Sequence, residues 1–487
     1  MSLVVLVFVE NVVFLKFFLS AGFAIFSYGC SMIKAIISCC LFSLAFSVQR
    51  PNIVFIFADD WGWGDLSCHG HPYVKTPNLD RLASEGTDFQ RFTVASGVCS
   101  PSRAAVMTGH FPARYSIDGH FAWVPSNEQR GMPDWLDLDA PYMAEMLQEA
   151  GYRTAHYGKW HLANNMIPDS PSPGEYGYDD YGAFNCSGEQ MPWYKDADRT
   201  NLFMEESVKA GKPFFVNVWM HEPHTPHHTV PKYEWMFQHL ENDERVYASV
   251  LAHADARVGQ ILDKLDELGV ADNTLVIFSS DNGPETTYPK HAQIKLIYDT
   301  ATGAGWAGGT AAGLTGGRKG HKHTIFEGGV GVPFIARWPK EIAAGKIDDE
   351  SLISAVDLLP TFCKLAHAEM PESYSPDGVD ITSVLKGEKM PSRSKPLFWK
   401  LATKGENRAK SSPTWARWAV VKDQWKLVAS GGLATVELYD ISGDYTESAD
   451  LSAEKPEVVK ALLASLNEWR ASLPESPSGN VFSAERK

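Results

Sequence analysis

A cysteine at the start of a short predicted helix is the residue with the most evident chemistry in this sequence. Cys99 precedes Pro101, which suits a first helical turn, and Gly109, which suits the end of the helix. The free backbone N–H groups and the dipole at a helix start favour an anion, and Arg103 lies one turn further on. Cys99 is therefore either a small buried residue or a thiolate nucleophile activated by these charges.

Two polar pairs follow apolar runs that have the length of strands. Asp59 and Asp60 come directly after residues 53–58, and Asp281-Asn282 comes directly after residues 274–280. Adjacent carboxylates at the end of a buried strand repel each other unless a cation lies between them. Hard oxygen ligands of this kind suit Ca²⁺ or Mg²⁺, and the alternative for the Asp pair is a solvated turn.

Two more predicted strands end in side chains that can transfer protons. Lys159 and His161 follow the strand over 152–157, and their spacing of two puts them on the same face of an extended segment. Four histidines occur within 221–228, after the strand over 213–220. Zinc binding is not indicated there, because the prolines force an extended path and no ligand pair is fixed in a helical frame.

The elements that position these residues predict an α/β fold. The apolar runs lack polar alternation, as in parallel strands that are covered on both faces. A helix over 243–268 has apolar residues at helical spacing and should cover one face, and Thr76 is expected to cap a helix that begins at Pro77. Strand ends in such a sheet form the edge where ligands bind, so the polar groups should converge there with Cys99.

The chain changes character near Met390. Short alternating strands follow, as in an antiparallel sheet, and then a helix over 456–469. We therefore expect an α/β catalytic domain over 49–390 with a large, mostly parallel central sheet flanked by helices. A smaller C-terminal α+β domain over 391–475 and a polar tail over 476–487 should follow it.

Four motifs, in order, resemble those of the formylglycine-dependent (type I) sulfatases, which have an alkaline-phosphatase-like fold. Cys99–Arg103 matches C-x-P-x-R, and Gly151–His161 matches G-Y-x-T-x-x-x-G-K-W-H. Pro223-His224 begins a P-H-x-P element, and Gly320–Gly329 matches G-x-K-x-x-x-x-E-G-G. The Arg that usually follows the last motif is Gly331 here. The resemblance spans roughly residues 50–470.

The resemblance implies a specific nucleophile and a metal ion. Cys99 would be oxidised to formylglycine (3-oxoalanine), whose hydrated aldehyde attacks sulfur, with Asp281 as the base and Arg103 steadying the nucleophile. One Ca²⁺ per chain would be held by the following residues: Asp59, Asp60, modified Cys99, Asp281 and Asn282.

The resemblance also assigns substrate-binding and proton-transfer roles. Lys159 and Lys322 would contact the sulfate oxygens, and Lys319 offers a competing register for the second lysine. His224, together with Lys322, would protonate the leaving alcohol, with His221 as second choice. His161 would then take the proton that allows sulfate to leave.

The resemblance thus implies an arylsulfatase-like sulfuric ester hydrolase acting on a sulfated carbohydrate, with a formylglycine-generating or sulfatase-maturating enzyme as partner. Two alternatives are a phosphate monoester or diester hydrolase of the same superfamily, and a carbohydrate-binding pseudoenzyme with unmodified Cys99. Aromatic residues within 164–200 either stack on sugars or pack within their own loop.

The composition of the chain limits which binding partners and which cellular compartment we expect. The net charge of −15 disfavours nucleic acids and anionic membranes. Residues 1–48 carry only three charges, which predicts an export segment and a periplasmic or secreted protein. Met32 would be the true start of that segment, and the alternative is a membrane anchor over 12–33. With Cys99 modified, three cysteines remain after export, so at most one disulfide can form.

The export segment predicts where the mature chain begins. Ala45-Phe46-Ser47 is a small-x-small cleavage site that follows an apolar stretch. N-terminal sequencing of secreted protein should therefore begin near Val48. A mature start far from this residue would contradict the assignment.

Overall fold

The computed structural model describes residues 4–9, 12–19, 22–28, 50–225, 227, 231–287, 310–390, 392–401, 412, 414–477 and 479–486. The chain divides into two compact units, Met1–Arg50 and Pro51–Lys487. In the first unit, an antiparallel sheet is formed by β1 (Val4–Val9), β2 (Val12–Leu19) and β3 (Gly22–Tyr28). The expected cleavage site lies outside the described residues.

The second unit is built on an eight-stranded sheet with the order β12-β5-β11-β10-β4-β9-β7-β8. Five neighbouring strands are parallel: β10 (Thr274–Ser280), β4 (Asn52–Ala58), β9 (Phe214–Trp219), β7 (Arg153–Lys159) and β8 (Asp180–Phe184). β11 (Phe334–Arg337) is antiparallel to both β10 and β5 (Thr87–Phe89), and β12 (Lys346–Asp348) forms the edge. The expected large, mostly parallel sheet is confirmed.

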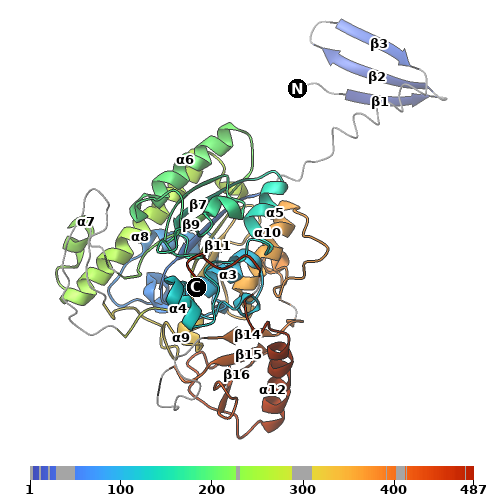
Figure 1. Ribbon diagram of the computed structural model, residues 1–487. Coiled ribbons are helices and arrows are strands. Elements are labelled where there is room, and N and C mark those ends of the chain that lie inside the picture. The colour runs from blue at the N-terminus through green and yellow to red at the C-terminus, as the bar shows by residue number, and fades with distance from the viewer. Residues whose placement is uncertain are drawn as a thin grey trace. The chain divides into compact units, whose positions relative to one another are not determined.

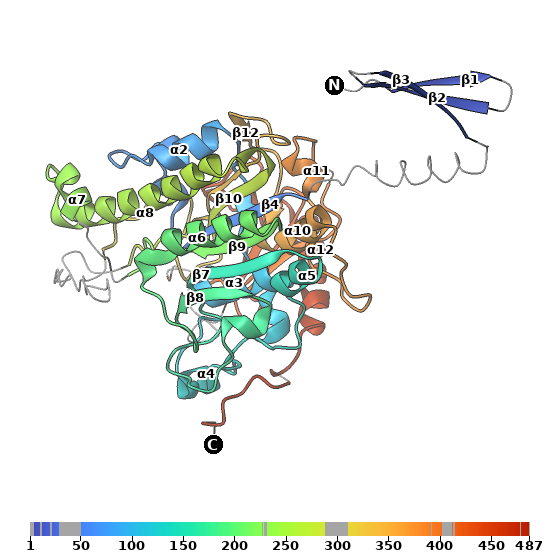
Figure 2. The ribbon, with the colours of Figure 1, turned by 90° about the horizontal axis from the view of Figure 1, so that it is seen from above.

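Helices cover both faces of the sheet, as its apolar strands require. Val54 and Ile56 of β4 face one core cluster, whereas Ile53, Phe55 and Phe57 face the other. The first cluster is covered by α2 (Pro77–Ser84), α6 (Asp196–Lys209) and α8 (Asn242–Glu267). The second is covered by α3 (Cys99–Thr108), α5 (Met143–Glu149) and α10 (Leu358–Ala366). Figure 2 shows the two helical layers on either side of the sheet.

A four-stranded antiparallel sheet with one long helix completes the fold (Figure 1). It contains β14 (Leu397–Lys400), β15 (Trp418–Lys422), β16 (Trp425–Ala429), β17 (Val436–Asp440) and α12 (Pro456–Ala471). This agrees with the expected C-terminal α+β architecture. The four-stranded sheet shares a core with the α/β part of the second unit. Trp469 of α12 stacks on Phe398, with ring centroids 4.7 Å apart, and contacts Phe111, with ring centroids 5.8 Å apart.

Short elements connect these layers. They are β6 (Phe92–Thr93), β13 (Ile353–Ser354), α4 (Val124–Gln129), α7 (Pro231–Glu234), α9 (Glu327–Val330) and α11 (Thr382–Leu385). The expected polar tail over 476–487 also packs on the α/β part of the second unit. Val481 is 2% exposed, and both Ser483 and Arg486 donate hydrogen bonds to Asp134.

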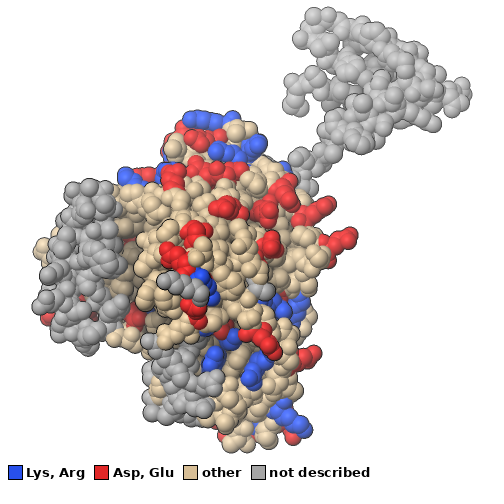
Figure 3. Space-filling model, viewed as in Figure 1, with Lys and Arg blue, Asp and Glu red and all other residues tan. Residues whose placement is uncertain are grey.

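The distribution of charged side chains on the surface agrees with the acidic net charge of the chain. Acidic and basic side chains are interspersed on the face in Figure 3, where no continuous basic patch covers the described residues. No helix among the described residues combines the length and apolar character that crossing a bilayer needs. The four cysteines of the described residues, Cys68, Cys99, Cys186 and Cys363, are all free.

The start of α2 is capped differently from the sequence expectation. Thr76 makes no capping hydrogen bond. Instead Asp255 of α8 accepts hydrogen bonds from the backbone N–H groups of Asn78 and Leu79, at 3.1 and 2.9 Å. A buried carboxylate from another helix therefore satisfies the free donors of α2 and ties it to α8.

We expect Asp255→Ala to lower the free energy of unfolding by about 1 to 3 kcal/mol, because two buried N–H groups lose their acceptor. Asp255→Asn keeps one acceptor oxygen and should cost less. Chemical denaturation of the full chain measures both changes. Equal stability of the alanine variant and the parent would contradict the assigned cap.

Candidate active site

Cys99 occupies the first position of α3 and is 3% exposed. Its Sγ lies 3.5 Å from Asp59 Oδ1 and 3.4 Å from Lys159 Nζ. Gly109 ends the helix with a positive φ of 63°, as the sequence predicts. Burial raises the pKa of the Cys99 thiol, and the neighbouring carboxylates add to this. These surroundings disfavour a thiolate, so the unmodified side chain is poorly suited to act as the nucleophile.

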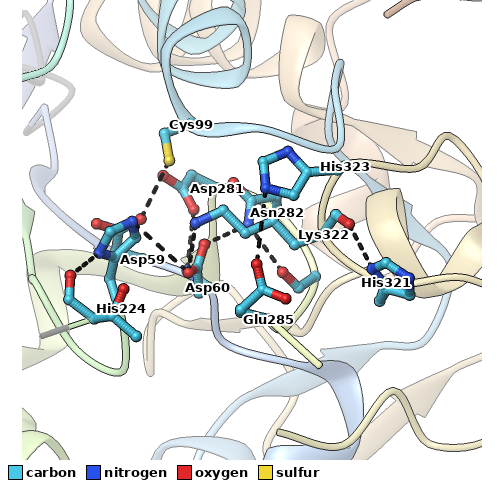
Figure 4. A network of polar contacts seen from close by, with 12 residues as sticks. Asp59, Asp60, Cys99, His224, Asp281, Asn282, Glu285, His321, Lys322 and His323 are labelled. Carbon is cyan, nitrogen blue, oxygen red and sulfur yellow. Dashed lines mark hydrogen bonds and ion pairs between the residues drawn. The ribbon is translucent and has the colours of Figure 1, made fainter. Parts of the chain in front are cut away.

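Four oxygen-bearing side chains meet beside Cys99 at the carboxyl edge of the sheet (Figure 4). Asp59 and Asp60 follow β4, and Asp281 and Asn282 follow its parallel neighbour β10, where Ser280 pairs with Ala58. The Asp60 backbone N–H donates to Asp281 Oδ1 at 3.2 Å. Asn282 Nδ2 donates to Asp60 Oδ1 at 2.7 Å. The strand register thus brings two pairs that are distant in sequence into direct contact.

These oxygen donors fit a hard divalent cation. Asn282 Oδ1 is buried and accepts no hydrogen bond from the described residues. Burial raises the pKa of both Asp60 and Asp281, and neighbouring carboxylates add to the effect. Donor atoms of Asp59, Asp60, Cys99 and His224 lie within 4.8 Å of one another. An ion with a preference for oxygen, such as Ca²⁺, would use the free amide oxygen and reduce the carboxylate repulsion.

Three cationic side chains surround the carboxylates. Lys322 Nζ lies 2.7 Å from Asp60 Oδ2, Arg103 Nη2 lies 2.6 Å from Asp281 Oδ2, and Lys159 Nζ contacts Asp59. Burial alone would lower the pKa of each cation, but the carboxylates outweigh it and each pKa is raised. All three groups therefore stay charged and can bind an anion.

Two histidines flank this cluster as neutral side chains. His161 Nε2 lies 3.0 Å from the Phe121 carbonyl, and Nδ1 has no hydrogen-bond partner among the described residues. His224 Nε2 lies 3.8 Å from Asp60 Oδ2. Burial and nearby lysines lower the pKa of both rings well below the ordinary value. His221 is buried, and its ring centroid lies 5.6 Å from that of His224.

The structure separates the two candidate lysines. Lys322 reaches Asp60, whereas Lys319 Nζ lies 2.7 Å from the Tyr439 hydroxyl and 3.1 Å from Glu437 on β17. Only Lys322 of this pair reaches the carboxylate cluster. Gly331, where the family motif usually has Arg, lies beside another cation, because a Cβ there would be 3.3 Å from Arg318 Nε.

Sequence reasoning missed a buried ion network that holds the segment carrying Lys322. Lys426 of β16 is fully buried and lies 2.7 Å from Glu327 and 3.0 Å from Glu447. Glu447 also accepts a hydrogen bond from the Glu327 backbone N–H at 2.6 Å. The C-terminal sheet therefore anchors the end of the motif that begins at Gly320. No local pattern marks Lys426 or Glu447, because their partner lies about a hundred residues earlier in the chain.

Sequence reasoning also missed a buried ion network that contacts the turn carrying His221 and His224. Arg257 of α8 contacts Glu222 and lies 3.3 Å from Asp196. The Glu222 carbonyl accepts a hydrogen bond from the Asp59 backbone N–H at 3.2 Å. The turn that carries His221 and His224 is thus tied to both α8 and the end of β4.

Most of the aromatic residues singled out within 164–200 pack against the protein, which is one of the two alternatives that the sequence left open. Tyr176 is fully buried, Tyr178 is 4% exposed and Trp193 is 7% exposed. Trp193 packs under the Arg257 guanidinium, at 5.3 Å from its ring centroid. These three rings belong to the protein interior, so they cannot form a wall on which sugars stack.

A buried cluster of cations and carboxylates at the carboxyl edge of a parallel sheet is the arrangement of an enzyme that acts on anionic esters. Residues 51–368 match the family model described as Sulfatase, and residues 319–472 match the N-sulphoglucosamine sulphohydrolase C-terminal model. The chain therefore belongs to the sulfatase family and is a sulfatase.

Curated relatives and solved structures agree. N-acetylgalactosamine-6-sulfatase of Sus scrofa is 32% identical over 388 residues, 72% of this chain and 68% of the relative. Arylsulfatase A of Bos taurus is 33% identical over 382 residues, 70% of this chain and 69% of the relative. The crystal structure of Ps i-CgsB in complex with k-i-k-neocarrahexaose superposes with a TM-score of 0.72 at 26% identity, covering 90% of this chain and 96% of that one. A phosphonate monoester hydrolase of Agrobacterium radiobacter shares the fold, with a TM-score of 0.61 at 21% identity, covering 87% and 96%.

The Lys426 network yields a test of how the C-terminal sheet supports the site. Lys426→Met removes the cation that both buried glutamates contact directly, so we expect a loss of about 3 kcal/mol in stability. Among folded molecules, kcat/KM should fall on the order of tenfold to a hundredfold because Lys322 is misplaced. Thermal unfolding and steady-state kinetics measure these effects.

The double variant Lys426→Met/Glu447→Gln is the matched comparison for Lys426→Met. It removes one of the two carboxylates that have lost Lys426, so it should recover part of the lost stability. Lys422→Met, at the exposed end of β15, should behave like the parent. Parental stability and kinetics in Lys426→Met would show that the network does not support the site.

Proposed function

We propose that this sulfatase removes O-sulfate from a sulfated carbohydrate, with formylglycine at position 99 and one Ca²⁺ at the carboxylate cluster. The supporting observation is the convergence of Arg103, Lys159 and Lys322 on three carboxylates next to Cys99. Formylglycine would supply the nucleophilic oxygen, and Ca²⁺ would polarise a sulfate oxygen. The cation would be held by these residues: Asp59, Asp60, Asp281, Asn282 and the modified residue 99.

The cationic side chains bind and orient the ester. Lys159 of β7 reaches Asp59, and Lys322 of the segment after Gly320 reaches Asp60, so both ammonium groups would contact the oxygens of one tetrahedral anion bound at the cluster. Their charges would stabilise the negative charge that grows on the sulfate oxygens during transfer. Arg103, paired with Asp281, orients that carboxylate beside residue 99, where Asp281 would act as the base.

Two histidines complete the proton transfers. His161 is neutral and has a free Nδ1, which suits a base that accepts a proton from residue 99. His224 Nε2 lies 3.8 Å from Asp60 Oδ2, and this ring would take up a proton when the anionic substrate binds and, together with Lys322, pass it to the leaving alcohol. His221 contacts the His224 ring and would help to bind the substrate.

The substrate class rests on similarity. Relatives named N-acetylgalactosamine-6-sulfatase and a structural neighbour crystallised with k-i-k-neocarrahexaose favour a sulfated carbohydrate. The negative net charge argues against polyanion binding over the whole surface, so recognition would be concentrated at the cluster.

Maturation and location belong to the same proposal. Formylglycine requires a formylglycine-generating or sulfatase-maturating enzyme, and the apolar segment over 1–48 would direct export to the periplasm or the medium. Residues 49–390 would form the catalytic domain, with residues 391–475 as the smaller domain that supports it.

The choice between sulfate and phosphate esters is tested with matched substrates. The protein, produced with a maturating enzyme, should hydrolyse an aryl sulfate much faster than the corresponding aryl phosphate. Lys322→Ala should lower kcat/KM for the sulfate on the order of a hundredfold or more, because a cation that faces the transferred group is lost. Lys319→Ala is the matched control and should retain far more activity. Preference for the phosphate would instead favour a phosphate ester hydrolase.

The modification is tested by intact mass of the peptide that carries residue 99. Conversion of the Cys99 CH2–SH group to the aldehyde removes sulfur and two hydrogens and adds one oxygen, which lowers the peptide mass; hydration adds one water and nearly restores the mass, so the aldehyde form is the one that is diagnostic. A calcium chelator should abolish turnover of the modified protein, and added Ca²⁺ should restore it. An unmodified Cys99 in fully active protein would contradict the proposed nucleophile, and unmodified, inactive protein from a maturing host would favour a pseudoenzyme.

A further inference from the structure

A second group of metal-binding side chains lies away from the candidate active site, at the edge of the large sheet. Cys68 and His69 belong to one short 3-10 turn, Ser67–His69, and Asp88 lies on β5 beside the outermost strand β12. One ligand atom from each of the three side chains lies within 4.8 Å of the other two. Thiolate, imidazole and carboxylate are the three ligand types that zinc uses in proteins.

His69 is held between two hydrogen-bond acceptors. Nδ1 lies 2.7 Å from the Trp63 carbonyl, Nε2 lies 2.8 Å from Asp88 Oδ2, and the side chain is only 2% exposed. Both neighbours are acceptors, so the ring satisfies them either as an imidazolium or with a metal ion in place of the Nε2 proton. A ring held by a backbone carbonyl through one nitrogen, with the other nitrogen facing a carboxylate, has an orientation that is common among metal-ligating histidines.

Asp88 supplies a second, independent observation. The residue is 6% exposed, and its Oδ1 is buried with no hydrogen-bond donor among the described residues. Its Oδ2 accepts hydrogen bonds from His69 and from Gln90 Nε2, the latter at 2.7 Å. A carboxylate oxygen that is buried without a partner is costly, and a cation would remove that cost.

The electrostatic surroundings of Cys68 also favour a cation. The carboxylates of Asp88 and Asp80 lie close to the Cys68 thiol, and Asp80 Oδ1 accepts a hydrogen bond from the Cys68 backbone N–H at 3.0 Å. Cys68 is exposed, so an ion can enter from solvent. The site therefore combines negative potential, soft and hard ligands, and access.

We propose that Cys68, His69 and Asp88 bind one divalent transition-metal ion, with Zn²⁺ as the expected ion and a fourth position open to solvent. Binding releases the thiol proton of Cys68 and leaves His69 Nδ1–H donating to Trp63. The softness of the thiolate separates this site from the candidate active site, whose oxygen ligands suit Ca²⁺.

The position of the ion gives it a structural role. The Trp63 ring stacks on His69 with centroids 4.0 Å apart, and the Arg318 guanidinium lies 4.0 Å from the Trp63 centroid. Trp63 follows Asp59-Asp60 closely in sequence, and Arg318 precedes Lys322. A metal ion at His69 would thus fix one side of the stack that joins the two segments from which the catalytic cluster is built.

The test uses Co²⁺ as a spectroscopic probe on the full-length, Ca²⁺-loaded protein. Co²⁺ bound to a thiolate gives a near-ultraviolet charge-transfer band, and we expect this band to saturate at a single equivalent and to disappear when Zn²⁺ is added. Cys68→Ser should abolish the band. Asp88→Asn should weaken Zn²⁺ binding on the order of tenfold to a hundredfold. Zn²⁺ should also raise the melting temperature of the parent but not of Cys68→Ser.

Matched variants locate the ion. Cys186→Ser removes a buried thiol elsewhere and should keep the band, as should Cys99→Ser. A band that survives in Cys68→Ser but is lost in Cys99→Ser would place the ion at the candidate active site and overturn the proposal. Absence of any saturable Co²⁺ or Zn²⁺ binding in the parent would overturn it as well.

Discussion

Mutual neutralisation of buried charges is the constraint on which this structure depends. Three carboxylates and three cations are packed at one edge of the sheet: Asp59, Asp60, Asp281, Arg103, Lys159 and Lys322. Each of them would be too costly to bury alone, and removal of one partner leaves an uncompensated charge in the interior. The same arrangement that makes the cluster tolerable also offers charged groups to a small anion and oxygen ligands to a divalent cation. Stability and anion binding are therefore properties of one set of side chains.

The sequence was informative where chemistry follows directly from a strand. The apolar runs that became β4 and β10 have no polar alternation, so burial on both faces and a parallel sheet could be predicted. The polar pairs after them could then be assigned to a shared edge, and the register of Ser280 with Ala58 brings them together. The roles proposed for these side chains come from the resemblance to the family motifs, because the geometry of a lysine beside a carboxylate is equally that of a structural ion pair.

Partners that lie far apart in the chain could not be predicted. Asp255 caps a helix that starts more than a hundred and seventy residues earlier, and Lys426 meets Glu327 across a similarly nonlocal contact. No periodicity or motif encodes such pairs, because they depend on how whole layers pack. The same reason explains the aromatic loop. Aromatic residues in a loop, such as Tyr176 and Tyr178, are typical of an exposed sugar-binding surface, but other parts of the protein bury these two rings.

The anchoring of the Gly320–Gly329 segment by Lys426 and Glu447 has a consequence for the order in which a ribosome releases this chain. Cys99 emerges early, whereas the strands that hold Lys322 opposite it emerge near the end. A nascent chain therefore passes through a long interval in which its reactive position is accessible and its pocket does not yet exist. The maturating enzyme that the proposed function requires would have access to residue 99 during that interval, before the finished protein encloses it.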